Sequence, residues 1–427
     1  MEKVLIVTAR KLRRELFNAA RELNLSGWRS VLNLIKVTIR NDRAEKVGSI
    51  SEVLAHFPRA GLSLGLARRA MFISQKEVGV QKFGQSGEIQ LHYCLVIKPF
   101  ISFREKGCLL ISFENQIQAI LNKDVLEAIQ ERYHLIFLPS WTGFYSPAVF
   151  ELVKLSGDNP IFVLPVHENE RELVKGLGQT CIPLPFNAAS WVNQDFFDSE
   201  VTIARDIDCL MVANFANFKR HWLLFKALQG LPKSVSAVCV GVAIGNRNAE
   251  SIRQEAEDYG VSDRVKIIEN PRQEDLRLYF QRAKVFCAMS YREGSFIAVA
   301  EALMSGTPVV MFKNAHIGTK SLITPEVGAL VGSVSELRER VMEFMEFKEN
   351  EKVRQIARES ISAQANWQKL NEMLADWSLK NGLQWTADIE AFYSMRLSFY
   401  YFDENAKEKL RPDYEYLAEK GIRISLP

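Results

Sequence analysis

Short apolar runs alternate with amphipathic stretches along most of the chain. The apolar runs comprise residues 108–113, 134–139, 160–166, 209–215, 235–242, 265–268, 285–289 and 309–312. Between them, segments such as residues 124–132, 246–259 and 273–282 carry apolar positions at helical spacing. Apolar strands separated by helices are typical of parallel sheets with helices on their faces. The pattern therefore predicts an α/β protein.

The first ninety or so residues follow this pattern less clearly. We interpret residues 3–9, KVLIVTA, as a first parallel strand and residues 12–23 as a basic helix after it. Residues 31–39 are expected to form a strand, residues 50–57 a helix and residues 76–88 a mobile loop. The sequence of residues 30–90 does not indicate a function.

The length of the chain predicts more than one domain. With 427 residues, of which 47% are hydrophobic and 25% charged, the chain is too long for one ordinary core. We predict one domain over residues 1–205 and a second over residues 206–378. Residues 379–427 would form a helical tail that either crosses back to the first domain or meets a partner.

The stretch over residues 290–310, SYREGSFIAVAEALMSGTPVV, contains the most informative chemistry. Glu293 stands before Gly294 at a strand end, and Glu301 lies within the apolar helix that follows. A helix start at Gly294 would direct the N–H groups of Ser295 and Phe296 at a phosphate. Glu301 would accept hydrogen bonds from a vicinal diol. The alternative is two surface carboxylates beside a core helix.

This stretch resembles the retaining GT-B glycosyltransferases, whose signature is a Glu-x7-Glu motif followed by a Gly-x-Pro-Val-Val segment. The matching residues are Glu293, Gly294, Phe296, Glu301, Ala302, Gly306, Pro308, Val309 and Val310. The resemblance implies the GT-B fold, in which two Rossmann-like, doubly wound domains face a central cleft. It also implies that Glu301 contacts the nucleotide ribose and that Glu293 contacts the donor sugar.

The resemblance places further donor contacts after the strand at residues 209–215. Lys219 matches a lysine that neutralises the donor diphosphate, and Arg220 stands beside it. Asn214 occupies the position of the family's arginine and carries no charge. Asn270 ends another strand, where the backbone of relatives holds the nucleobase, although an ordinary Asn-Pro turn fits equally well.

Two strand ends in the first half offer candidate acceptor contacts, because ligands of open α/β sheets bind beyond the carboxyl ends of strands. His167 would bond to a sugar hydroxyl, and Trp141 and Tyr145 would stack on a sugar ring. Each of them is equally compatible with an ordinary loop position. The glycine-rich loop that follows the first strand in relatives is absent here. Residues 181–190 resemble the family's linker between domains by position only.

Charge is unevenly distributed along the chain. The first 150 residues hold about 21 Lys and Arg against 13 Asp and Glu, although the net charge of the whole chain is only +3. We interpret the basic runs at residues 10–14 and 68–69 as solvated helix faces, with anionic lipid headgroups, a lipid diphosphate or an acidic glycan as the alternative. No nucleic-acid-binding motif accompanies them.

Composition excludes several other classes. The six cysteines lie singly, without a partner at metal-ligand spacing, and are expected to be reduced core thiols. We expect no metal site, because the sequence has no Asp-x-Asp with a supporting cluster of metal ligands. The absence of a long apolar span and of a secretory signal predicts a cytoplasmic protein, with peripheral contact at the inner membrane face left open.

Together these features predict a retaining glycosyltransferase (EC 2.4) that uses a nucleotide-diphosphate sugar and neither metal nor cofactor. Glu293, Lys219 and His167 are its predicted catalytic residues. The acceptor would be a glycan, a lipid-linked sugar or a small molecule in polysaccharide or glycoconjugate biosynthesis. Two alternatives remain, namely a non-catalytic GT-B binding or regulatory subunit and a GT-B sugar-nucleotide epimerase or hydrolase.

Overall fold

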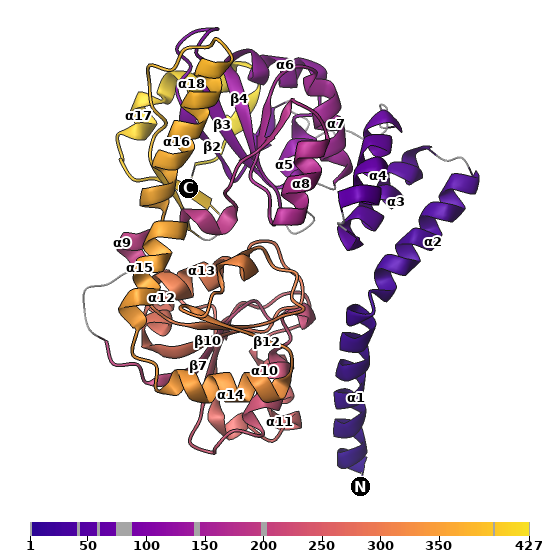
Figure 1. Ribbon diagram of the computed structural model, residues 1–427, viewed down its shortest axis with the longest axis vertical. Coiled ribbons are helices and arrows are strands. Elements are labelled where there is room, and N and C mark those ends of the chain that lie inside the picture. The colour runs from indigo at the N-terminus through magenta and orange to yellow at the C-terminus, as the bar shows by residue number, and fades with distance from the viewer. Residues whose placement is uncertain are drawn as a thin grey trace. The chain divides into compact units, whose positions relative to one another are not determined.

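The computed structural model contains two compact α/β units (Figure 1). It describes residues 2–40, 43–57, 60–73, 88–140, 146–197, 203–395 and 398–426. Unit 1 consists of Met1–Glu22 and Val192–Ser362, and unit 2 consists of Leu23–Trp191 and Ala363–Pro427. The chain therefore passes between the two units three times, whereas the sequence predicted domain boundaries at residues 206 and 379.

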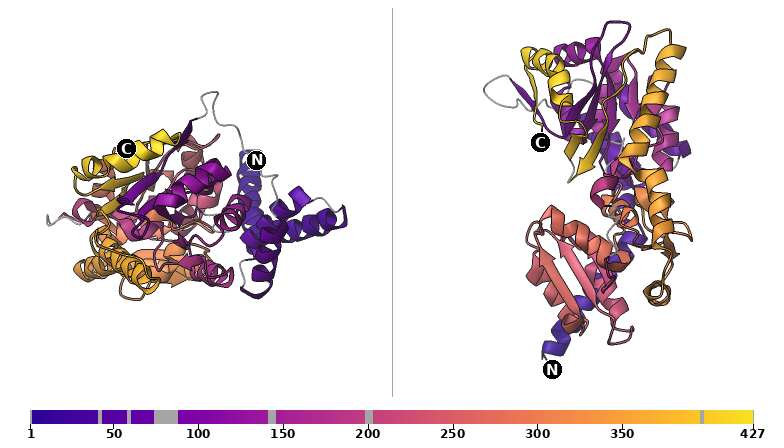
Figure 2. Two further views of the ribbon diagram at one scale, coloured as in Figure 1. Left: turned by 90° about the horizontal axis from the view of Figure 1, so that it is seen from above. Right: turned by 90° about the vertical axis from the view of Figure 1, so that its left-hand side faces the viewer.

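Unit 1 is built on a parallel sheet of six strands in the order β12-β11-β10-β7-β8-β9. The strands are β7 (Ile207–Val212), β8 (Ala237–Gly241), β9 (Val265–Glu269), β10 (Ala283–Ala288), β11 (Val309–Phe312) and β12 (Gly328–Val331). The right-hand view of Figure 2 shows strands of this sheet side by side. From β7 the chain first winds toward β9 and then returns to build β10, β11 and β12 on the other side, which is the doubly wound order.

Helices cover both faces of this sheet (Figure 1). The helices of unit 1 are α1 (Glu2–Glu22), α9 (Gln194–Phe197), α10 (His221–Leu228), α11 (Ala249–Asp258), α12 (Gln273–Arg282), α13 (Ile297–Met304), α14 (Val334–Met345) and α15 (Asn350–Ile361), with 3-10 turns η3 (Asn217–Lys219), η4 (Ser262–Arg264) and η5 (Gly318–Leu322). Helices α10, α11 and α14 lie on one face, and α12 and α13 lie on the other. Strands β8 and β11 are buried along their whole length because helices cover both faces of the sheet, whereas the edge strand β9 carries the exposed Lys266.

Unit 2 has a five-stranded sheet in the order β2-β3-β4-β5-β6. The strands are β2 (Cys94–Lys98), β3 (Gly107–Ser112), β4 (Tyr133–Leu138), β5 (Ile161–Val163) and β6 (Cys181–Pro183), and two smaller sheets pair β1 (Ile89–Leu91) with β15 (Ile422–Ile424) and β13 (Phe392–Met395) with β14 (Ser398–Tyr401). Strands β3 to β6 run parallel, while β2 is antiparallel to β3.

The helices of unit 2 come from both parts of the chain. They are α2 (Leu25–Arg40), α3 (Arg43–His56), α4 (Ala60–Ile73), α5 (Glu114–Ala119), α6 (Lys123–Arg132), α7 (Pro147–Ser156), α8 (Glu168–Gly176), α16 (Ala363–Lys380), α17 (Ala406–Lys409) and α18 (Arg411–Glu419), with the 3-10 turn η2 (Ala188–Trp191). Helices α5, α7 and α8 cover one face of the sheet, while α16 and α18 cover the other (Figure 1).

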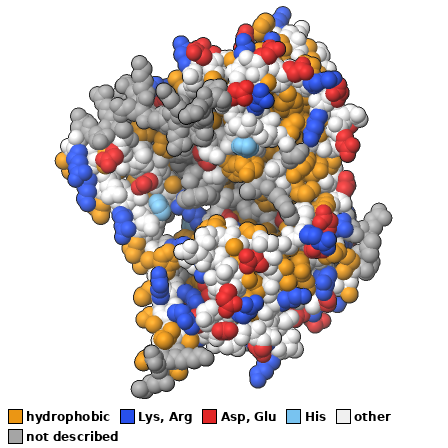
Figure 3. Space-filling view, turned by 180° about the vertical axis from the view of Figure 1, so that it is seen from behind, with side chains coloured by type: hydrophobic (Ala, Val, Ile, Leu, Met, Phe, Trp, Pro, Cys, Tyr) orange, Lys and Arg blue, Asp and Glu red, His pale blue; other side chains and the backbone are white. Residues whose placement is uncertain are grey.

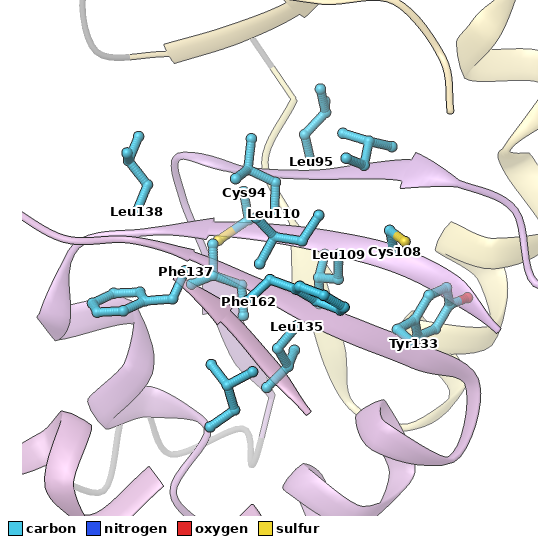
Figure 4. Packing of buried hydrophobic residues seen from close by; sticks show 14 of the residues in the cluster. Cys94, Leu95, Cys108, Leu109, Leu110, Tyr133, Leu135, Phe137, Leu138 and Phe162 are labelled. Carbon is cyan, nitrogen blue, oxygen red and sulfur yellow. The ribbon is translucent and has the colours of Figure 1, made fainter. Parts of the chain in front are cut away.

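The core of unit 2 is built from the apolar runs that the sequence indicated. Leu109, Leu135, Phe137 and Phe162 are at most 1% exposed and pack across β3, β4 and β5 (Figure 4). Each strand supplies side chains to both faces, so a polar substitution on either face would bury an unpaired group. All six cysteines are buried, and none forms a disulfide, as expected.

The prediction for the N-terminus is wrong. Residues 3–9 form the beginning of helix α1 instead of a first strand, and residues 31–39 lie within helix α2. The basic run at residues 10–14 is not a solvated face throughout, because Arg10 and Arg14 both pair with the buried carboxylate of Asp258. The helix predicted at residues 50–57 is confirmed as part of α3. Most of the expected loop at residues 76–88 lies outside the described residues.

Two further differences concern the second half of unit 2. Residues 181–190, predicted as a linker, contain strand β6 and most of the turn η2. Residues 379–427 are not purely helical, since β13, β14 and β15 lie within them. No helix in the described part of the chain is long and apolar enough to cross a membrane.

A buried ion pair fastens the C-terminal segment to the sheet of unit 2. Lys98 Nζ donates to Glu105 Oε1 at 2.8 Å, and both side chains are at most 1% exposed. Burial opposes ionisation of Glu105, but hydrogen bonds from Lys98 and from Ala387 and Thr386 outweigh it and lower the pKa of Glu105 to about 2. The carboxylate thus links β2 to the chain that follows α16.

We expect Glu105→Gln to destabilise the protein by about 3 kcal/mol at pH 7, because the substitution leaves the Lys98 ammonium buried without its counter-charge. Because the pKa of Glu105 is lowered on folding, its contribution is complete above the unfolded pKa and is lost as pH falls toward 2. The difference in urea-unfolding free energy should therefore shrink between pH 5 and pH 3. The exposed pair Lys123–Glu127 supplies the control: Glu127→Gln should cost less than about 1 kcal/mol. Equal costs for the two variants would contradict the prediction.

Candidate functional site

The candidate site lies at the carboxyl ends of β7 and β10. These strands are neighbours in the sheet, and the chain leaves them toward opposite faces, into α10 and α13. Such a topological switch point is where open α/β sheets bind ligands. Residues 213–220 follow β7, and residues 289–296 follow β10. The sheet order therefore brings together two segments that the sequence separates by about seventy residues.

A buried ion pair joins these two segments. Glu293 accepts hydrogen bonds on Oε1 from Lys219 Nζ and from Ser290 Oγ. The side chains of Lys219 and Glu293 are 8% and 12% exposed. The backbone N–H of Glu293 donates to the carbonyl of His316 at 3.0 Å, which fixes the loop that carries the carboxylate. The structure thus brings together two of the three predicted catalytic residues.

The buried surroundings of Lys219 strengthen the interaction of its ammonium with an anionic ligand. Burial lowers the pKa of Lys219, and the neighbouring Glu293 carboxylate partly offsets this effect. The ammonium also lies 4.5 Å from the centre of the Phe296 ring. A desolvated ammonium interacts strongly with an anion because little water screens the charge.

Glu301 lies on α13 and is 9% exposed. Burial raises the pKa of its carboxyl from 4.5 to about 7. None of the hydrogen bonds and ion pairs of the described residues involves its side-chain oxygens. A carboxyl that is buried without partners can accept hydrogen bonds from a ligand, and these bonds would favour its ionised form.

The turn before α13 differs in detail from the prediction. The helix begins at Ile297, three residues after Gly294, and Phe296 caps it in the left-handed region at φ 51°. Ser295 and Phe296 are 5% and 7% exposed. No backbone acceptor among the described residues bonds to the N–H of Ser295 or Phe296. The expected cluster of free N–H groups is therefore placed in a tight turn before the helix.

Arg220 points away from this ion pair. It occupies the left-handed region at φ 57°, is 2% exposed, and donates from Nε to the carbonyl of Met289 at 2.6 Å and from Nη1 to Asn18 Oδ1 at 3.0 Å. Burial lowers the pKa of its guanidinium to about 10. Arg220 therefore extends toward α1, whereas Lys219 meets Glu293.

The remaining predicted residues of unit 1, Asn214 and Asn270, take no part in the ion pair of Lys219 and Glu293. Asn214 is half-buried, and its Oδ1 accepts from the N–H of Ala216 at 3.2 Å, which closes the turn after β7. Asn270 is exposed, has φ 53° and donates its N–H to the carbonyl of Gly241 at 2.8 Å. Both residues therefore shape turns at the carboxyl edge of the sheet.

His167 belongs to unit 2. It is half-buried and stands at the N-cap position of α8, four residues after strand β5 ends at Val163. Its neighbour Glu170 is buried and accepts from the N–H of Val166 at 2.5 Å. The predicted aromatic wall of Trp141 and Tyr145 lies outside the described residues.

The sequence analysis did not identify two features of unit 1, namely the role of Ser290 and the contact of the α1 arginines with α11. Ser290, which holds Glu293, follows β10 without any motif of its own. The arginines of α1 were visible as a basic run, but their contact with α11 joins residues almost 250 positions apart. Helical spacing of Arg10 and Arg14 was the available signal, because residues four apart share a helix face.

We expect Glu301→Gln to stabilise the ligand-free protein at pH 8. Because folding raises the pKa of Glu301, the native state binds the proton more tightly, and stability falls as pH rises from about 4.5 through 7. Removing this carboxyl should raise the unfolding free energy by on the order of 2 kcal/mol at pH 8, with little effect at pH 4.5. Denaturant unfolding at both pH values measures this. The exposed Glu343→Gln is the control, and a gain that is independent of pH would contradict the explanation.

Comparison with known proteins agrees with this geometry. Residues 193–361 match the family model described as glycosyl transferases group 1. An uncharacterized glycosyltransferase of Haemophilus influenzae is 26% identical over 132 residues, which are 31% of this chain and 36% of that protein. This chain thus matches only about a third of the length of its curated relative.

The fold of the chain resembles that of a solved structure. The Anabaena protein HepE, crystallised with UDP, aligns with a TM-score of 0.50 at 18% identity, over 62% of this chain and 78% of that one. Sucrose-phosphate synthase of Thermosynechococcus elongatus aligns at 0.49 with 16% identity, over 64% of this chain and 73% of that one. The two α/β units have the GT-B fold. Residues 193–361 are thus similar to the group 1 glycosyl transferases.

Proposed function

We propose that this protein transfers a glycosyl group from a nucleotide-diphosphate sugar to an acceptor hydroxyl, with retention of configuration. The observation that carries the proposal is the buried Lys219–Glu293 pair at the switch point of unit 1. A buried ammonium beside a carboxylate suits a ligand that carries both a diphosphate and sugar hydroxyls. The setting would be polysaccharide or glycoconjugate biosynthesis.

Lys219 and the N–H groups of Ser295 and Phe296 would bind the diphosphate. In the reaction the bond between the anomeric carbon and the diphosphate oxygen breaks, and negative charge grows on the leaving diphosphate. Donors that are already in place stabilise this charge without reorganisation. The acceptor oxygen forms the new bond to the anomeric carbon, and its proton passes to the departing phosphate oxygen.

The two glutamates would position the donor. Glu293 would accept from hydroxyls of the donor sugar, while Ser290 and the backbone of His316 hold its loop in place. Glu301 would accept from the ribose hydroxyls, and the turn at Asn270 would border the nucleobase. His167 would bond to the acceptor.

The proposal includes neither metal nor cofactor. Within the described residues, no three His, Cys, Asp or Glu side chains group closely enough to hold a metal ion. Lys219 and backbone amides would supply the positive charge that a divalent ion gives in other transferases. We propose a cytoplasmic location, and the acceptor would be a glycan, a lipid-linked sugar or a small molecule.

We expect one nucleotide diphosphate to stabilise the protein against heat. UDP is the first to test, because HepE was crystallised with it. At a hundred times the dissociation constant, a ligand should add about 2.7 kcal/mol to the unfolding free energy. Glu301→Ala should lose most of this shift, and the exposed Glu343→Ala should keep it. If no nucleotide or nucleotide sugar shifts the melting temperature, the non-catalytic alternative replaces the proposal.

Glu293→Ala should lower the transfer rate about a hundredfold or more, in line with the loss of a group that stabilises a transition state. The same variant should still bind nucleotide diphosphate, because Lys219 and the amides remain. The assay follows nucleotide release and sugar transfer, with the nucleotide sugar that raises the melting temperature as the donor. Release of free sugar without any acceptor would instead indicate a hydrolase, and full activity in the variant would remove the role of Glu293.

A further inference from the structure

Unit 1 contains a cavity of about 350 Å³ between α1, the turn before α10, and α11. Its size is within the range of small-molecule sites. Arginines make up more than half of its lining residues. Arg10, Arg13, Arg14 and Arg21 come from α1, and Arg220 and Arg247 come from the sheet side. Neither Lys219 nor Glu293 lines it, so the cavity is separate from the candidate donor site.

Two buried acids hold the wall together. Asp258 accepts from Arg10 Nε at 3.0 Å and pairs with Arg14 Nη2 at 2.8 Å, and its side chain is fully buried. Glu255 pairs with Arg247 at 2.8 Å. Arg10, Arg14 and Arg247 therefore neutralise the two acids, while Oε2 of Glu255, which also lines the cavity, has no hydrogen-bond partner.

Three other arginines of the cavity lack a carboxylate. None of the ion pairs of the described residues includes Arg13, Arg21 or Arg220. Arg220 is 2% exposed, and its Nη2 is buried without a hydrogen-bond partner, as is Nη1 of Arg14. A buried donor that remains unpaired destabilises the ligand-free protein. Such groups persist where something else accepts from them.

Apolar surface adjoins these charges. Trp222 lines the cavity and stacks on Tyr259, and Phe17 on α1 lies against Arg21 at 4.5 Å from its guanidinium carbon. A guanidinium group binds two phosphate oxygens at once, because it is planar, has parallel N–H donors and stays charged. The cavity thus offers several unpaired phosphate ligands next to an aromatic wall.

We propose that this cavity binds a phosphate-bearing ligand, a phosphomonoester or diphosphate, at a site distinct from that of the donor. Arg13, Arg21 and Nη2 of Arg220 would bind the phosphate oxygens, and Trp222 would contact the rest of the ligand. Because Arg220 follows Lys219 directly, a ligand here would contact the segment that carries the donor lysine.

The phosphate could belong to a free metabolite or to a lipid headgroup. Helix α1 presents Leu5, Leu12 and Leu16 to solvent, with 64%, 57% and 61% of each residue exposed. Figure 3 shows such hydrophobic side chains interspersed with Lys and Arg on the surface seen from behind. Apolar side chains near a basic site would suit a lipid, whereas the aromatic wall suits either source.

Binding of pyrophosphate to the full-length protein, measured by calorimetry, tests the proposal. The double variant Arg13→Gln, Arg21→Gln should lose one binding site or bind at least about tenfold more weakly, because it removes two charged hydrogen-bond donors from the phosphate. Arg340→Gln, an exposed arginine on α14, is the matched control and should bind as the wild type does. Circular dichroism checks that each variant is folded.

A second arm distinguishes the two sources. Co-sedimentation with phosphatidylcholine vesicles that contain phosphatidylglycerol, lost in the double variant and absent with phosphatidylcholine alone, would identify a lipid headgroup. Pyrophosphate binding without co-sedimentation would identify a free phosphate. The proposal fails if the double variant matches the wild type in both assays or if the wild type binds in neither. Pyrophosphate binding that is lost only in Lys219→Met would place the anion at the donor site and would also overturn it, while leaving the proposed function intact.

Discussion

The ion pair between Lys219 and Glu293 is the interaction on which the candidate site depends. Removing two charges from water costs several kcal/mol for each ion, and their attraction offsets this only in good geometry. That geometry comes from the sheet, because β7 and β10 are neighbours only in the doubly wound strand order. Ser290 and the backbone of His316 then hold Glu293 in position. The fold thus keeps a charged pair dry at the edge where a ligand would bind.

The sequence predicted most of unit 1 because its local and global signals agree. The apolar runs of β8 and β11 are continuous, helices such as α11 and α12 are amphipathic, and Gly306 follows α13 at φ 73°. A residue with a side chain would be strained there, so the small-residue stop was readable from the sequence. Glu293 was likewise found because it stands eight positions before Glu301 in the Glu-x7-Glu motif. Where the hydrophobic periodicity, the helix-stop signal and the candidate site residues agree, a single sequence is sufficient to predict the element and its site.

The N-terminus could not be predicted in this way. KVLIVTA is rich in β-branched residues, which favour strands, yet it begins α1. Arg10 and Arg14 lie four apart and share one buried acceptor, Asp258, which is almost 250 residues away. The same holds for β1, which pairs with β15 at the other end of the chain. Tertiary contacts at such separation leave no local pattern and override weak propensities.

Lys219 and Arg220 show the limit of assigning roles by proximity in sequence. The two residues are adjacent, but Lys219 ends a 3-10 turn while Arg220 is left-handed, and the backbone therefore directs their side chains to different places. One side chain meets Glu293 and the other meets α1. A non-glycine residue with positive φ is uncommon, and its cost persists only where the surroundings stabilise it. Here the contacts of Arg220 with Met289 and Asn18 provide that stabilisation.

Both candidate binding sites contain groups that the fold leaves unsatisfied. Glu301 is nearly buried and has a pKa of about 7, so ionising it at neutral pH costs free energy in the ligand-free protein. Nη2 of Arg220 is buried without an acceptor. Most residues of a protein satisfy their own packing and hydrogen bonding, which stabilises the fold. Residues that do not are concentrated at functional sites. A hydroxyl donating to Glu301, or a phosphate oxygen accepting from Arg220, would remove the cost, and the affinity for that ligand would rise by the same amount. The residues that weaken the empty protein are therefore those that would bind most selectively.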